Sequence, residues 1–105
     1  FISEKFTNDW ISELVEDIDM QILKAPSSVH CKEKDNEGIS SFCLITTSHI
    51  CLHSWEKTSP NLVQLDVYTC SDLPKYKVIK KLDEMKPVNI EWEIYDREHK
   101  LSKVE

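Results

Sequence analysis

The middle of the chain alternates apolar and polar residues with the two-residue period of β-strands. Two segments rich in β-branched and aromatic residues, Ile39–Thr46 and His49–Trp55, are separated only by Thr47 and Ser48. A polar loop then leads to Val63–Tyr68, where apolar residues occupy every second position. Strands joined by such short connections pair antiparallel. We therefore expect an antiparallel sheet to be the framework of the fold.

The segment before these strands predicts a helix and a further strand. Apolar residues recur there at helical spacing: Trp10, Ile11, Leu14, Val15, Ile18 and Ile22. We expect Thr7 or Asn8 to cap this helix and Pro26 to end it. A short edge strand over Phe1–Phe6 is predicted before the helix, and a strand over Ser27–Lys32 with a polar turn is predicted after it.

The segment after the strands predicts a second helix and a last strand. The apolar face of this helix is expected to comprise Tyr76, Ile79, Leu82 and Met85. Its solvent-exposed face is expected to carry the lysines Lys75, Lys77, Lys80 and Lys81. We expect Ser71 or Asp72 as the N-cap, with Pro74 in the first turn. The alternation over Val88–Ile94 predicts a final strand, and the polar tail from Asp96 is expected to fray.

These elements follow one another as β-α-β-β-β-β-α-β within 105 residues, which predicts a single α+β domain. The expected architecture is a two-layer sandwich, in which both helices cover one face of the antiparallel sheet. The other face then needs a partner, because a chain of this size buries little apolar surface by itself. We expect a homodimer in which two sheets pack face to face, in an αββα arrangement.

The charge balance favours a cationic small molecule as partner. The chain carries 19 acidic and 13 basic residues, so its formal net charge is −6, and no basic stripe offsets it. Nucleic acid would be repelled on average and is not expected as a partner. No apolar stretch approaches the roughly 20 residues that a bilayer requires, so a membrane partner is not expected either. The chain begins with Phe1 rather than Met, and no signal-peptide pattern is visible.

The four cysteines suggest the cellular compartment. They are Cys31, Cys43, Cys51 and Cys70, and none forms a CxxC pair. An even number permits disulfides, but without a secretory signal we expect reduced thiols in a cytoplasmic protein.

Reactive side chains gather in Thr46–His53, and Cys70 closes the next strand. One interpretation is structural, since Ser, Thr, His and Cys all occupy half-buried strand positions. Another is a zinc site, because alternation places the donors His49, Cys51 and His53 on one strand face. That spacing is uncommon for zinc. The fourth ligand would have to be Cys31, Cys70 or His30, and we expect no metal.

A third interpretation rests on a longer pattern. Three stretches, Gly38–Ser40, Ile45–Glu56 and Leu65–Cys70, resemble the bacterial and archaeal S-adenosylmethionine decarboxylases. Those proteins carry a segment close to G-V-S, then E-S-H-I/L-x-I/L-H-T-W-P-E eight residues on, and later D-V/I/L-F-T-C. The serine spacing of eight, the Ser-to-His spacing of five and the Asp-x-aromatic-Thr-Cys ending all agree. The resemblance covers about residues 38 to 70.

The resemblance implies an autocatalytic cleavage between Thr47 and Ser48. In the family, the serine that matches Ser48 attacks the preceding carbonyl and becomes a pyruvoyl group at a new N-terminus. A strained peptide at this strand junction would favour the attack. His53 matches the histidine that removes a proton during processing, and Ser40 matches the serine that assists it. The products would be a chain of residues 1–47 and a second chain that begins at the former Ser48.

The resemblance also implies the reaction of the mature enzyme. The pyruvoyl group would form a Schiff base with the substrate amine and serve as electron sink, as pyridoxal phosphate does elsewhere. Cys70 matches the proton donor to the substrate Cα. Glu56 is the candidate for holding the ribose hydroxyls, next to Trp55. The product of S-adenosylmethionine decarboxylation is the aminopropyl donor for spermidine and other polyamines.

The chain departs from the family pattern in its adenosyl-binding features more than in its pyruvoyl-forming ones. Thr47 replaces the family's Glu, and Glu56 follows Trp55 directly because the proline between them is missing. Residues 31–37 contain no aromatic residue that could stack on adenine. Two alternatives therefore stay open: a pyruvoyl-dependent decarboxylase of arginine or ornithine, and a non-catalytic regulatory relative that does not process itself.

Overall fold

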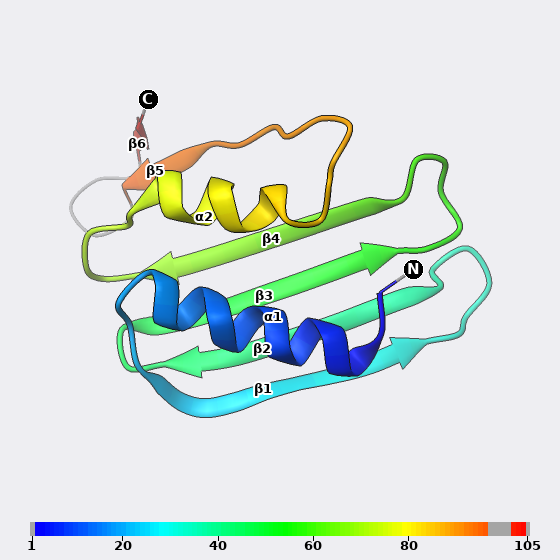
Figure 1. The fold of residues 1–105 in the computed structure, drawn as a ribbon, viewed down its shortest axis with the longest axis horizontal. Helices are drawn as coiled ribbons and strands as arrows, with labels where there is room; N and C mark the ends of the chain where they lie inside the picture. Colours follow the sequence, from blue (N-terminus) through cyan, green and yellow to red (C-terminus); the bar gives the residue numbers. More distant parts are fainter. Residues whose placement is uncertain (1, 97–101, 105) are drawn as a thin grey trace.

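The computed structural model describes residues 2–96 and 102–104. Four long strands form an antiparallel sheet in the order β1-β2-β3-β4 (Figure 1). These are β1 (Ile22–Cys31), β2 (Gly38–Ile45), β3 (Ser48–Trp55) and β4 (Leu62–Thr69). The helices are α1 (Glu4–Asp17) and α2 (Lys75–Asp83), and a separate short pair comprises β5 (Ile94–Asp96) and β6 (Ser102–Val104).

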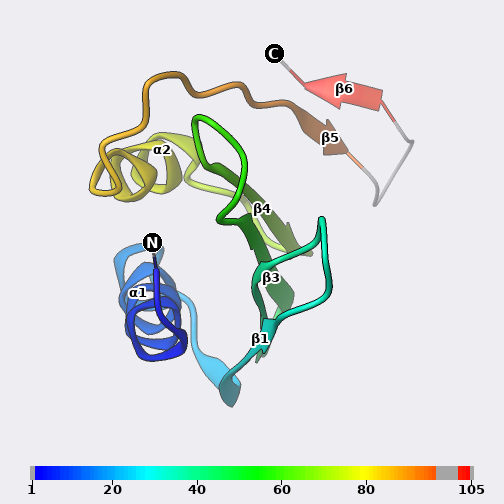
Figure 2. The same ribbon diagram turned by 90° about the vertical axis from the view of Figure 1, so that its right-hand side faces the viewer.

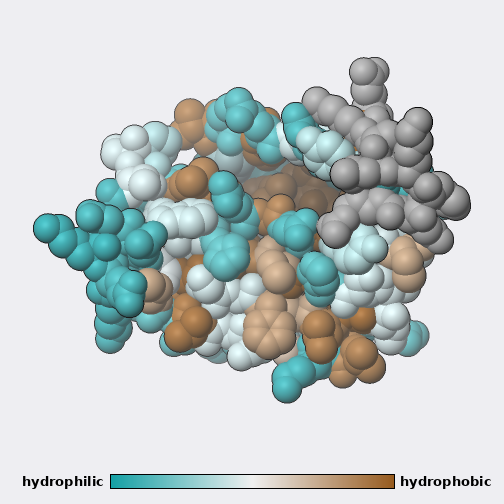
Figure 3. Space-filling model, turned by 180° about the vertical axis from the view of Figure 1, so that it is seen from behind, coloured by the Kyte–Doolittle hydropathy of each residue, from teal (hydrophilic) through white to brown (hydrophobic). Residues whose placement is uncertain are grey.

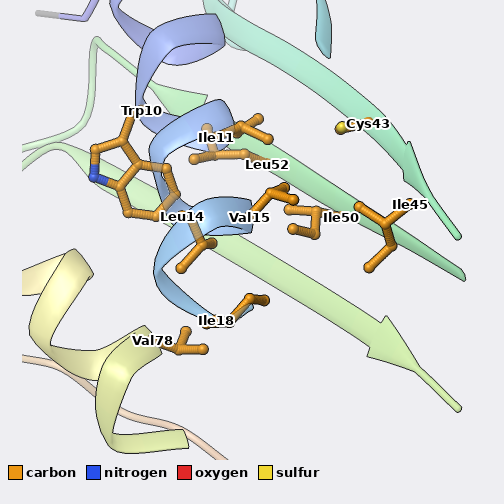
Figure 4. Packing of buried hydrophobic residues seen from close by; sticks show 10 residues of the cluster. All are labelled: Trp10, Ile11, Leu14, Val15, Ile18, Cys43, Ile45, Ile50, Leu52 and Val78. Atoms are coloured by element: carbon orange, nitrogen blue, oxygen red, sulfur yellow. The ribbon is translucent and has the colours of Figure 1, made fainter. Parts of the chain in front are cut away.

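The two helices lie on the same face of the sheet, as Figure 2 shows. The α+β class, the antiparallel sheet and the placement of both helices are thus confirmed. The core lies between α1 and the central strands, with Val78 of α2 at its margin (Figure 4). Its main members are Trp10, Ile11, Leu14 and Val15 of α1 with Cys43, Ile45, Ile50 and Leu52 of β2 and β3.

The start of the chain differs from the prediction. Ser3 caps α1 by accepting a 3.0 Å hydrogen bond from the backbone N–H of Phe6, so the helix begins at Glu4. The predicted strand over Phe1–Phe6 is therefore wrong for residues 4–6, and Phe1 lies outside the described residues. The predicted caps Thr7 and Asn8 were wrong because a serine upstream provides the same side-chain oxygen one turn earlier.

The end of the first helix also differs. The helix stops at Asp17, and Asp19 adopts a positive φ of 56°, which turns the chain into β1. Pro26 does not end a helix: it lies inside β1, where the register to β2 shifts between Lys24 and Ser27. A strand irregularity tolerates proline because no ladder hydrogen bond is needed from its nitrogen.

The buried face of the second helix agrees with the predicted one only in part: Leu82 and Met85 pack against the core, whereas Tyr76 does not. Pro74 occupies the N-cap position without a side-chain cap, so neither Ser71 nor Asp72 caps it. Val78 is buried, whereas Tyr76 is 74% exposed. The side chain of Lys81 is only 3% exposed, because its ammonium group binds Glu13 at 2.5 Å and Glu84 at 2.9 Å. The prediction that Lys81 faces solvent is wrong.

The predicted last strand is mostly absent. Of Val88–Ile94 only Ile94 lies in a strand, and β5 pairs with β6 rather than with the main sheet. The element order of the described residues is therefore α-β-β-β-β-α-β-β. Alternation indicates that one side of an extended segment is apolar, but it does not show which strand, if any, the backbone of that segment pairs with. Of the polar tail, Asp96 and Ser102–Val104 lie in strands, and residues 97–101 lie outside the described residues.

The sheet face opposite the helices has no covering layer among the described residues; we call it the open face. Figure 3 views it, and apolar and polar side chains alternate over it. Phe42 is 43% exposed there, Leu44 37% and Val29 62%. The open face also carries His49, Cys51 and His53 of β3, at alternate positions as predicted. Among the described residues, no helix is long and apolar enough to cross a membrane.

Candidate active site

The junction between β2 and β3 places Ser48 in an unusual backbone conformation. Thr46 and Thr47 form the turn, and Ser48 begins β3, paired with Ile45 on one side and Thr69 on the other. Ser48 has a φ of 152°, a region that only glycine enters readily. A serine held there by strands on both sides stores strain in the backbone. The strained peptide expected at this junction is therefore present at the serine itself.

The carbonyl of Thr47 is held by the strand that follows. The backbone N–H of Cys70 donates a 3.0 Å hydrogen bond to the carbonyl oxygen of Thr47. The side chain of Thr47 is turned away toward the core and donates to the sulfur of Met20 at 3.6 Å. A fixed N–H donor stabilises negative charge on a carbonyl oxygen that a nucleophile attacks. Thr47, Ser48 and Cys70 thus form one group, which we call the junction group.

Ser40 and His53 form a second group. They are direct cross-strand partners on β2 and β3, and the Ser40 hydroxyl lies 2.9 Å from His53 Nδ1. Both side chains project from the open face, and the His53 ring is 6.1 Å from the ring of Trp55. The serine orients the imidazole, which can then exchange a proton at its other nitrogen. A small pocket of about 220 Å³ adjoins this pair, between Cys31 and Trp55.

The two groups lie at opposite ends of β3. Ser48 is the first residue of the strand and His53 the sixth. At a rise of about 3.3 Å per residue, five steps separate them by roughly 17 Å. That separation exceeds any hydrogen-bonding or proton-transfer distance. Within one chain, the structure brings Ser40 to His53 and Cys70 to Thr47, but it does not bring the two groups together.

The predicted substrate-binding residues Trp55 and Glu56 point to different sides. Trp55 lies beside His53, whereas a Glu56 carboxylate oxygen contacts His30 Nε2. His30 is opposite Ile39, which is buried beneath α1, so this contact lies on the helix side of the sheet. Sequence reasoning considered His30 only as a zinc ligand. The 26-residue separation gave no local signal of the contact with Glu56.

The alternative interpretation of His49, Cys51 and His53 as zinc ligands finds no support in the geometry. No group of three or more His, Cys, Asp or Glu side chains within the described ranges could hold a metal ion. His49 Nε2 is 3.8 Å from Asp66 instead. Burial raises the pKa of the Cys51 thiol, and the charge of Asp66 raises it further. All four cysteines are free thiols.

A larger groove borders the open face next to β4. It has a volume of about 990 Å³ and runs between β4, α2 and the segment that leads to β5. Apolar side chains of both sides line most of it, and Cys51, His53 and Asp66 lie on its sheet wall. Figure 3 shows this hollow as a brown recess. A small organic molecule therefore has room beside His53.

Comparison with known proteins agrees with the family resemblance seen in the sequence. A family model described as S-adenosylmethionine decarboxylase matches residues 2–98. The S-adenosylmethionine decarboxylase proenzyme of Archaeoglobus fulgidus is 31% identical over 90 residues, which cover 83% of this chain and 78% of that protein. No solved structure matches the chain.

Proposed function

Because the chain belongs to the S-adenosylmethionine decarboxylase family, we propose that it is a proenzyme that cleaves itself between Thr47 and Ser48 and then decarboxylates S-adenosylmethionine. The observation that carries this proposal is the geometry of the junction group. A serine with a φ of 152° follows a carbonyl that already accepts a hydrogen bond from Cys70. Strain and polarisation act on the same peptide.

The cleavage begins with attack of the Ser48 hydroxyl on the Thr47 carbonyl carbon. The peptide C–N bond breaks, its nitrogen takes up a proton, and an ester joins Thr47 to the Ser48 oxygen. An ester is normally less stable than an amide, so release of backbone strain at Ser48 favours this step. The N–H of Cys70 stabilises the charge that develops on the Thr47 oxygen.

The second stage breaks the ester by elimination. A base removes the Ser48 Cα proton, the Cβ–O bond breaks, and Thr47 leaves as a free carboxylate. The remaining enamine tautomerises, and one water molecule hydrolyses it with release of ammonia. A pyruvoyl group is left on the second chain. The overall balance is one peptide and one water giving two chains and one ammonia.

The base in this stage matches His53, oriented by Ser40, and a second copy must supply it. In its own chain, His53 is roughly 17 Å from Ser48. Two copies packed open face against open face, with their strands running in opposite directions, would bring the Ser40–His53 pair of each to the end of the sheet where the junction group of the other lies. The exposed Phe42, Leu44 and Val29 would be covered in the same step. The homodimer expected from the sequence thus becomes a requirement of the chemistry.

The residues at the start of β3 suit a pyruvoyl group derived from Ser48. Such a group accepts a substrate amine and withdraws the electrons that carbon dioxide leaves behind. Thr69 fixes the position of residue 48 from β4, and the exposed Cys70 follows directly. Its thiol would deliver a proton to the substrate Cα. Trp55 of the second copy would border the substrate on the His53 side.

A second candidate is the decarboxylation of a plain cationic amino acid such as arginine or ornithine. The observation that favours it is the contact between Glu56 and His30. This contact holds the predicted ribose-binding carboxylate on the helix side, away from His53. A substrate without a ribose needs no such carboxylate.

The substrates can be separated by release of labelled carbon dioxide. Purified, processed protein is incubated with S-adenosylmethionine, arginine or ornithine, each labelled in its carboxyl group, and Ser48→Ala protein serves as control. Release from S-adenosylmethionine alone is expected. Release from arginine or ornithine alone would show that this amino acid, and not S-adenosylmethionine, is the substrate. No release from any of the three by cleaved protein would contradict the decarboxylase function.

A further inference from the structure

One carboxylate of the open face lies between the two groups of the candidate site. Asp66 is the cross-strand partner of Cys51, and 67% of its side chain is exposed. Leu65 and Val67 on either side of it pack toward the core, so alternation directs Asp66 to the open face. Together with Cys51 and His53, Asp66 lines the large groove next to β4. No step of the proposed reaction uses this carboxylate.

The negative charge of Asp66 acts on its surroundings and has room for a ligand. His49 Nε2 is 3.8 Å from an Asp66 oxygen, which is longer than a hydrogen bond. A bound cation would share the carboxylate with this histidine. Burial raises the pKa of the Cys51 thiol, and the charge of Asp66 raises it further. The open face around Asp66 therefore attracts a cation and disfavours a second anion.

The distance from residue 48 to Asp66 fits the substrates of the proposed function, on which this inference rests. Ser48 is level with Thr69, and Asp66 lies three residues from Thr69 along β4, or about 10 Å. S-adenosylmethionine, arginine and ornithine all carry a positive charge on the side chain. If the substrate amine is held at residue 48, this charge lies five to seven bonds, or about 6–9 Å, from the backbone there. An Asp66 oxygen can then approach it to the distance of an ion pair.

We infer that Asp66 binds the side-chain positive charge of the substrate and selects cationic substrates over neutral molecules of nearly the same shape. The carboxylate and residue 48 belong to the same chain, so the strand register sets the distance between them. Removal of the carboxylate charge weakens the binding of a cationic ligand. A neutral ligand loses nothing, because it does not make this charge interaction.

Ligand pairs that differ mainly in this charge test the role of Asp66. S-adenosylhomocysteine lacks the sulfonium methyl group of S-adenosylmethionine and its charge, and citrulline is the neutral counterpart of arginine. Binding of all four to Ser48→Ala protein is measured by calorimetry, because this protein cannot cleave itself or turn over a substrate. Adding Asp66→Asn is expected to raise the Kd of the bound cationic ligand about tenfold and that of its neutral counterpart at most about twofold. The ligand that binds shows whether the charge is a sulfonium or a guanidinium.

Asp72→Asn is the matched control. Asp72 is an exposed carboxylate two residues after Cys70, and it does not line the groove. This variant changes the net charge by the same amount and should alter either Kd at most about twofold. Circular dichroism verifies that each variant is folded. An unchanged Kd of the cationic ligand with Asp66→Asn, an equal rise for its neutral counterpart, or an equal rise with Asp72→Asn would overturn the role of Asp66.

Kinetics of the processed enzyme give a second readout. In this background Asp66→Asn is expected to raise KM for the cationic substrate about tenfold and to change kcat by less than about threefold. The reason is that the side-chain charge is bound equally before and during the reaction. A kcat that falls as much as kcat/KM would contradict a role in binding this charge.

The two series separate this inference from the proposed function. A wild type that cleaves itself and decarboxylates, together with unchanged binding in Asp66→Asn, would reject the role of Asp66 and leave the function intact. An uncleaved wild type with the expected Asp66→Asn difference would reject the function and leave the recognition of the charge. Ser48→Ala protein that binds neither cationic ligand more tightly than its neutral counterpart would also overturn the role of Asp66.

Discussion

The backbone N–H of Cys70 donates a hydrogen bond of 3.0 Å to the carbonyl oxygen of Thr47. This bond connects residues with roles in both proposed reactions. The Thr47 carbonyl is attacked during self-cleavage, and Cys70 matches the proton donor in decarboxylation. It involves main-chain atoms only. The Thr47 side chain is turned toward Met20. The hydrogen bond to the attacked carbonyl therefore does not depend on the side chain at position 47, where the family has Glu.

Two inactive variants should restore cleavage when they share a dimer. Alone, Ser48→Ala lacks the nucleophile and His53→Ala lacks the base, so both chains should stay intact. When they are co-expressed, the His53→Ala chain should be cleaved by the histidine of its partner, and the Ser48→Ala chain should not. Mass spectrometry of differently tagged chains reads this directly. A His53→Ala chain that stays intact in the mixed dimer would show that the histidine does not act across the interface.

Cys70→Ala should separate processing from decarboxylation. The variant keeps the backbone N–H that binds Thr47, so cleavage should proceed, whereas loss of the thiol should lower the decarboxylation rate by about 10²–10⁴-fold. Gel analysis of cleavage and labelled carbon dioxide release measure the two steps. Exposed Ser71→Ala is the control for a change next to this position. If Cys70→Ala decarboxylates at the wild-type rate, the thiol is not the proton donor.

Gly38→Ala should destabilise the sheet beside Ser40. Gly38 has a φ of +158°, and a Cβ there would lie 1.8 Å from the backbone oxygen of Ser54 on β3. The strands would have to separate, so the free energy of unfolding should fall by about 3 kcal/mol or more. Urea denaturation measures this against exposed Ser27→Ala, which should change it by at most about 0.5 kcal/mol. A Gly38→Ala protein of wild-type stability would contradict the close approach of the Gly38 and Ser54 backbones.

Lys81 should contribute to stability through its two carboxylate partners. Burial lowers the pKa of Lys81, but the hydrogen bonds to Glu13 and Glu84 outweigh this and raise the pKa above its ordinary value of 10.5. Lys81→Ala should reduce the free energy of unfolding by about 2 kcal/mol, and exposed Lys80→Ala by at most about 0.5 kcal/mol. Because the folded pKa is raised, the contribution is complete below pH 10.5 and is lost as pH rises through the folded pKa. If Lys81→Ala lowers the free energy of unfolding no more than Lys80→Ala does, the ion pairs of Lys81 do not stabilise the fold.

The predictable part of the fold was the part fixed by period-two alternation. The predicted segments Ile39–Thr46 and His49–Trp55 correspond to β2 and β3, and no strand end differs by more than one residue. The alternation was clear because one side of each strand is buried under α1. The cross-strand contact of Ser40 with His53 follows from the short turn, which sets the register. Val88–Ile94 alternates equally well, yet its partner strand depends on tertiary packing that no local pattern records.

The site was predictable as a set of residues but not as an arrangement. The spacing pattern indicated Ser40, Ser48, His53 and Cys70. Their division into two groups at opposite ends of β3 depends on strand geometry, which a motif does not express. Two positions in the fold could not be predicted for the same reason. Pro26, which usually ends a regular element, lies at a register shift inside β1, and Lys81, a residue type that usually faces solvent, is buried in an ion pair.

The intact mass of the purified chain, followed during incubation after expression, is the most direct test of cleavage between Thr47 and Ser48. The full-length species is expected to disappear and to be replaced by residues 1–47 and by a chain from position 48 onward with a pyruvoyl terminus, while Ser48→Ala remains whole. A wild-type chain that stays full length, with an ordinary peptide between Thr47 and Ser48, would contradict it.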